Sequence, residues 1–288
     1  MRLDAATVLL QWATGGLVFL WVTTRRREVG IGYGWLLRAS YGVLAAGALA
    51  AGRALDRVTL RDICSLLVVV ATGAALVVSI TRRRAGVAGE RARRERRAAR
   101  VAAMTVDVDR PVPADVKREP DPTIPECPPV LDLIAPVFGV IGLVAAALAA
   151  GGPDGLAVAR TLVGAAFLGA VSDAMLLGHW YLVQPGLGRA PLLDLNRWLA
   201  RLWPLEVAVL LWPTGMLSVL SGTIDDGYGG ILGWFWVTCA VTTLVLTFVT
   251  AAALKERAYA AVMAATGLLY LAILTAFGTD LVARATLA

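Results

Sequence analysis

Long apolar runs alternate along the chain with short segments that hold most of its charges. Uncharged runs of about 18 residues or more recur from one end to the other, and a helix needs about 20 such residues to cross the hydrocarbon core of a bilayer. The regular alternation of apolar and polar residues that marks membrane β-strands is missing from the sequence. The pattern therefore predicts an all-α, polytopic transmembrane bundle of about eight spans, at residues 5–24, 31–52, 63–81, 131–150, 156–182, 200–220, 230–253 and 257–281.

Basic residues gather at alternate connections between these spans. They follow the first and third spans and separate the fifth from the sixth and the seventh from the eighth, at residues 25–27, 82–84, 189–201 and 255–257. The opposite loops at residues 151–155 and 221–230 hold Asp154, Asp225 and Asp226 and few bases. Since basic loops stay in the cytoplasm, we expect both termini on the non-cytoplasmic side. Lysine occurs only at positions 117 and 255, an arginine bias typical of GC-rich bacterial genomes, so we expect the bacterial cytoplasmic (inner) membrane.

One long connection, residues 82–130, divides the chain into a three-span part (1–81) and a five-span part (131–288) of one membrane domain. Nine arginines and two glutamates fall within residues 82–100, whereas residues 105–129 are acidic and rich in proline. The first stretch predicts a basic helix on the anionic leaflet or against a partner protein, and the second predicts an extended linker. The arginines expected to make this contact are Arg91, Arg93, Arg94, Arg96, Arg97 and Arg100.

Composition narrows the classes of function. The net charge of +6 would suit nucleic acid, but topology already accounts for the basic loops, so we expect no nucleic-acid partner. One histidine, His179, and three well-separated cysteines make a zinc site, an iron–sulfur cluster or a bis-histidine haem improbable, and we predict no metal site. Phosphate-binding loops, HExxH and GxSxG motifs are missing from the sequence.

The fifth predicted span contains the most informative polar residues, in the run Ser172-Asp173 to His179-Trp180-Tyr181. Ionisable groups inside a span are costly to bury and are candidates for function. Asp173 and His179 are about 120° apart around a helix, whereas Ser172 shares the face of His179. Four roles for His179 stay open: a structural hydrogen bond, a donor to a quinone carbonyl, an axial ligand to haem or a chlorin, or a proton relay.

Asp173 needs neutralisation, a cation or water at its depth in the membrane. Arg38, in the second span, is the best intramembrane cation for it, and the alternative is a polar clasp between helices.

The sixth predicted span adds Pro213 and Glu206. Proline in mid-span should kink the helix and free the carbonyl of Val209. Glu206 is expected about one turn inside the cytoplasmic boundary, at the depth of His179, so we predict that the two side chains meet.

Three functions follow from this inventory. The first is an accessory or anchoring subunit of a larger membrane complex, in respiratory or other electron transfer near a quinone. The second is a proton-coupled or small-solute transporter that uses Asp173 and the kink at Pro213. The third is an intramembrane lipid-modifying enzyme with His179 and Glu206 as acid and base. The converging polar residues are few, so we expect that the chain is not an enzyme on its own.

Overall fold

The long apolar runs form long helices in the computed structural model, which describes residues 3–83, 85, 95–99, 101, 127–151, 154–256 and 258–287. Nearly all of this part of the chain is α-helical, and it contains no strand. The helices are α1 (Ala5–Thr24), α2 (Ile31–Ala54), α3 (Thr59–Thr81), α5 (Leu131–Ala149), α6 (Asp154–Val183), α7 (Ala190–Leu211), α8 (Gly215–Leu220), α9 (Ile231–Ala253) and α10 (Tyr259–Thr286).

Six of these helices are long and apolar enough to cross a bilayer: α1, α3, α5, α6, α9 and α10. Their outward faces are apolar, as shown by exposed side chains such as Val70, Val137 and Leu274. Exposing so much apolar surface to water is unfavourable, whereas contact with acyl chains is favourable. The chain is therefore a multi-pass membrane protein. Helices α2 and α7 are as long as the others but are less apolar on average.

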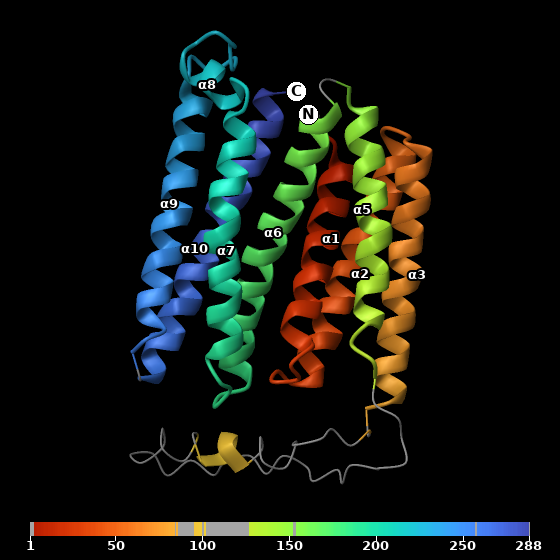
Figure 1. The fold of residues 1–288 in the computed structure, drawn as a ribbon, viewed down its shortest axis with the longest axis vertical. Helices are drawn as coiled ribbons and strands as arrows, with labels where there is room; N and C mark the ends of the chain where they lie inside the picture. Colours follow the sequence, from red (N-terminus) through yellow and green to blue (C-terminus); the bar gives the residue numbers. More distant parts are fainter. Residues whose placement is uncertain are drawn as a thin grey trace.

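The long helices lie side by side, and both chain termini lie at one end of the bundle (Figure 1). We call the end that holds both termini the terminal end. The opposite end holds the last turn of α3 and the first turn of α5, and we call it the linker end. Helix α1 packs against α2, α5 and α6, and α6 also packs against α7 and α10. The apolar core lies chiefly around α1 and α6, with Leu17, Leu168 and Leu177 almost fully buried.

The predicted sixth span is wrong in its boundaries. Helix α7 begins at Ala190 and ends at Leu211, and a break of three residues separates it from α8. The first turns of α7 contain the charged residues Asp194 and Arg197, which suggested a loop. In the structure, one face of these turns is buried by leucines spaced three or four residues apart: Leu192, Leu195 and Leu199. The first half of this helix is amphipathic, so a prediction based on uncharged runs did not include it.

Helices α1 and α6 cross at glycines. A Cβ atom added to Gly15 would collide with the backbone carbonyl of Ala165, and one added to Gly169 would collide with the backbone of Gly15. Small residues allow such close backbone approach in membrane bundles, where van der Waals packing between helices replaces the hydrophobic effect. This crossing fixes the position of Asp173, which lies one turn from Gly169 on α6.

We expect Gly15→Val to destabilise the bundle by several kcal/mol, since the backbone of α6 would have to move away. Gly73→Val is the matched control, because a Cβ atom at Gly73 meets nothing within 4 Å. Thermal unfolding in detergent should show a lower midpoint for the first variant and an almost unchanged one for the second. Equal midpoints for both would contradict the close crossing.

Candidate functional site

The predicted site residues lie at three separate places in the bundle. His179, Trp180 and Tyr181 lie near the linker end, Ser172 and Asp173 lie near the middle of α6, and Glu206 lies toward the terminal end. The side chains of His179, Asp173 and Glu206 have different neighbours, so these residues do not form one site.

His179 faces outward from the bundle. Its Nδ1 atom is 3.0 Å from the hydroxyl of Tyr270 on α10, and the two rings meet edge to face at a centroid distance of 6.3 Å. Tyr270 is 42% exposed, and His179 is also exposed. Among the described residues the histidine Nε2 atom has no partner. A polar pair thus sits on a surface that is otherwise apolar.

The two aromatic residues after His179 point elsewhere. Trp180 contacts the ring of Tyr33 on α2 and donates from Nε1 to Gln184 at 3.0 Å. Tyr181 is buried and donates to the carbonyl oxygen of Gly188 in the following loop. Both residues hold the end of α6 in place and so fix the direction in which His179 points.

Asp173 is completely buried and faces α2. Tyr41 donates a hydrogen bond to its Oδ1 atom, and Tyr33 donates to its backbone carbonyl at 3.3 Å. The Oδ2 atom has no hydrogen-bond partner among the described residues. Neighbouring Ser172 accepts from Trp12 Nε1 at 2.8 Å and donates to the carbonyl of Leu168 at 2.7 Å. A carboxyl group held by tyrosine in the middle of a bundle is a candidate proton-binding group.

Arg38 does not pair with Asp173 as expected. It forms a bidentate ion pair with Asp132 on α5, with Nε–Oδ1 and Nη2–Oδ2 distances of 2.8 and 2.7 Å. Both side chains are buried. The physical reason is depth: α2 and α5 both start at the linker end, and Arg38 and Asp132 lie in their first two turns, nearer to each other than to mid-span Asp173.

Glu206 does not meet His179. Because α7 starts at Ala190, Glu206 lies about 24 Å along the helix from the linker end, whereas His179 lies about 6 Å from the last residue of α6. Glu206 is instead completely buried beside the charges of Asp280 and Arg284 on α10. Neither of its carboxylate oxygens has a hydrogen-bond partner among the described residues.

Asp280 and Arg284 form a buried ion pair one helical turn apart, with an Nε–Oδ2 distance of 2.7 Å. Gln11 on α1 also donates to Asp280, at 3.2 Å. The Nη2 atom of Arg284 has no partner within the described part of the chain. The sequence did contain a signal for this pair, since an acid and a base four residues apart face the same side of a helix.

The break at Pro213 exposes backbone carbonyls, and Arg160 on α6 binds them. Its Nε atom donates to the carbonyl of Val209 at 2.8 Å, and its Nη2 atom donates to that of Trp212 at 2.5 Å. A buried guanidinium thus satisfies backbone acceptors that the interrupted helix leaves without partners.

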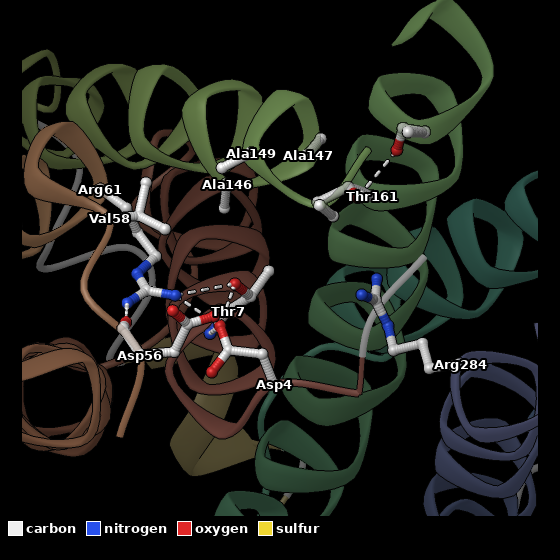
Figure 2. Close-up of a pocket in the computed structure, with 12 residues that line it drawn as sticks. Asp4, Thr7, Asp56, Val58, Arg61, Ala146, Ala147, Ala149, Thr161 and Arg284 are labelled. Carbon is white, nitrogen blue, oxygen red and sulfur yellow. Dashed lines mark hydrogen bonds and ion pairs between the residues drawn. The ribbon is translucent and has the colours of Figure 1, made fainter. Parts of the chain in front are cut away.

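A hollow of about 30 Å³ opens at the terminal end (Figure 2). Figure 2 shows Arg61 and Arg284 on opposite sides of it, with Asp4 and Thr7 between them. Arg61 is paired with Asp4 and, at 3.1 Å, with Asp62. The volume accommodates about two water molecules and no larger ligand.

The basic linker is described only in part. Arg96 is exposed, and Arg97 donates from Nε to the carbonyl of Pro185 at 3.0 Å, so this segment contacts the loop between α6 and α7. The other predicted contact residues lie outside the described residues: Arg91, Arg93, Arg94 and Arg100.

Sequence reasoning missed the tyrosines that complete two of these places. Tyr41 and Tyr270 come from helices far from their partners in the chain, and a tyrosine in a span gives no signal of its own. Within the described residues, no group of three or more His, Cys, Asp or Glu side chains is close enough to hold a metal ion.

Comparisons with models of protein families, with curated proteins and with solved structures find no match to this chain. Function must therefore be argued from the geometry alone.

Proposed function

We propose that this chain is a subunit of a membrane electron-transfer complex and that it binds a quinone headgroup at His179 and Tyr270. The observation that supports the proposal most directly is the exposure of this hydrogen-bonded pair on a membrane-spanning surface. A polar side chain that faces acyl chains is costly, so a ligand or a partner should cover it. A quinone offers both a carbonyl oxygen for the polar pair and an apolar tail for its surroundings.

The proposal includes a topology of eight spans, with both termini on the non-cytoplasmic face of a bacterial inner membrane. Helices α2 and α7 have 24 and 22 residues, enough to cross, and they pack along α1 and α6. The buried arginine of α2 is paired with Asp132, so it does not face lipid. The basic loops at the linker end then lie in the cytoplasm.

The pair provides a suitable hydrogen-bond donor. When the hydroxyl of Tyr270 donates to Nδ1, the imidazole proton lies on Nε2, which then can donate to a quinone carbonyl. Met263, Leu271 and Leu274, all exposed on α10, supply apolar surface for the tail. When bound, the quinone would supply the redox chemistry, and the chain's own residues would orient it and exclude water.

The assignment as a complex subunit rests on the linker. Arg97 in the basic segment donates a hydrogen bond to the carbonyl of Pro185 at the linker end. Pro185 follows closely, in the sequence, the end of α6 that carries His179. A basic segment fixed at this end would present charge to an acidic partner protein in the cytoplasm. Electrons for a bound quinone would come from that partner.

His179→Ala and Tyr270→Phe should each weaken quinone binding about five- to tenfold, since a hydrogen bond contributes about 1 kcal/mol net. Binding is measured in nanodiscs as quenching of tryptophan fluorescence by short-chain ubiquinone and menaquinone analogues. Phe248→Ala is the control, because Phe248 is also an exposed aromatic residue but lies on α9. Unchanged affinity in both site variants, or an equal loss in the control, would refute the site.

Proton-coupled transport of a small solute is a second candidate function. The supporting observation is Asp173, a fully buried carboxyl group in mid-span with one oxygen unpaired and with Tyr41 as its side-chain hydrogen-bond donor. The interrupted helix at Pro213, with its exposed carbonyls, resembles the broken helices of transporters in this one respect.

If the chain moves protons, Asp173→Asn should reduce the flux at least tenfold while Ser172→Ala retains it. Proton flux into proteoliposomes is driven by a potassium diffusion potential and followed with an internal pH-sensitive dye. Wild-type flux equal to that of protein-free liposomes would exclude this second function.

A further inference from the structure

The terminal end of the bundle contains a buried acid that neither of these functions uses. Glu206 has no exposed surface, and neither of its oxygens has a hydrogen-bond partner in the described part of the chain. A fully desolvated carboxylate without partners is strongly destabilising, so its isolation needs an explanation.

Counting charges around Glu206 gives that explanation. Asp280 and Arg284 form a pair of their own, which leaves Glu206 beside a guanidinium that another carboxylate already neutralises. Arg160 on α6 is bound to two backbone carbonyls. Helix α9 offers one titratable group, Cys239, and the helical residues of α1 and α8 offer none. Two carboxyl groups thus share the charge of one arginine, and a proton is the simplest ligand that balances them.

The hollow at the terminal end reaches the edge of this cluster at Arg284, whereas Glu206 and Asp280 do not line it. Arg284 forms part of the wall of the hollow, which holds about two water molecules, and its Nη2 atom has no partner within the described residues. The same guanidinium is bound to Asp280, and its charge also acts on Glu206. The hollow therefore ends at the arginine whose charge the two acids share.

We infer that Glu206 is a proton-binding site that exchanges with the aqueous phase at the terminal end through the hollow beside Arg284. In the exchange, a proton leaves a hydronium ion in the hollow, passes the side chain of Arg284 and binds a carboxylate oxygen of Glu206, and water is left in the hollow. The reverse step returns the proton to water. Asp280 keeps its ion pair with Arg284 in both states, so the total charge of the cluster alternates between −1 and 0.

Infrared difference spectroscopy tests this inference on the whole protein in lipid. As pH is lowered, wild-type protein should gain a carboxylic-acid C=O band that is lost in Glu206→Gln and retained in Asp173→Asn. Asp173 is the matched control, because it is equally buried but is bound by Tyr41 and lies near the middle of α6, away from the hollow and from Arg284. The band of Glu206 should shift promptly in D₂O, because water reaches it. The same band surviving in Glu206→Gln would overturn the inference, whereas a second band that only Asp173→Asn removes belongs to Asp173.

Two further variants keep the test decisive if Glu206→Gln fails to fold. Glu206→Asp keeps the acid, so the band should remain but change in frequency. Ala150→Trp, at the wall of the hollow, should slow the D₂O shift of this band at least tenfold without removing it. An unchanged frequency in the first variant would show that the band does not belong to Glu206, and an unchanged exchange rate in the second would show that the hollow does not serve it.

Discussion

The pairing of buried charges inside the bundle is the constraint on which the rest of the structure depends. Hydrocarbon offers no hydrogen bonds, so each ionisable group among the spans needs a partner within the protein. Arg38 binds Asp132 at the linker end, and Arg284 binds Asp280 toward the terminal end. These pairs connect or stiffen helices that apolar packing alone would leave free to rotate or slide. The carboxyl groups of Asp173 and Glu206 have no such ion pair, and both are candidate proton-binding sites.

Much of the helical framework was predictable because the length of an apolar run maps directly onto the length of a spanning helix. The predicted spans at 5–24 and 131–150 match α1 and α5 within one residue. The start of α7 was not predictable by this rule, since its first half is amphipathic and buries leucines beside charged residues. A ten-residue error there moved Glu206 from one end of the bundle to the other, and the expected contact with His179 failed with it.

The candidate residues could be picked out from the sequence, but their neighbours in the bundle could not. An acid or a histidine in a span stands out from the sequence, and Asp173, His179 and Glu206 were identified in this way. Their neighbours depend on which helices pack together and at what angle, which no single run of residues encodes. Tyr41 and Tyr270 are examples: each lies more than 90 positions from its partner in the chain. The freed carbonyl of Val209 followed from the local effect of proline, but Arg160 as its donor did not.

The depth assigned to every polar residue depends on whether α2 and α7, the two less apolar long helices, cross the membrane. Single cysteines at exposed positions on either side of each helix, Glu28 and Arg57 for α2 and Ala190 and Thr223 for α7, test this in a background without native cysteines. Eight crossings predict that a membrane-impermeant maleimide applied to intact cells labels Arg57→Cys and Thr223→Cys, and that it labels Glu28→Cys and Ala190→Cys only after permeabilisation. Labelling of both members of either pair from the same side would contradict the topology and the depths assigned to His179, Asp173 and Glu206.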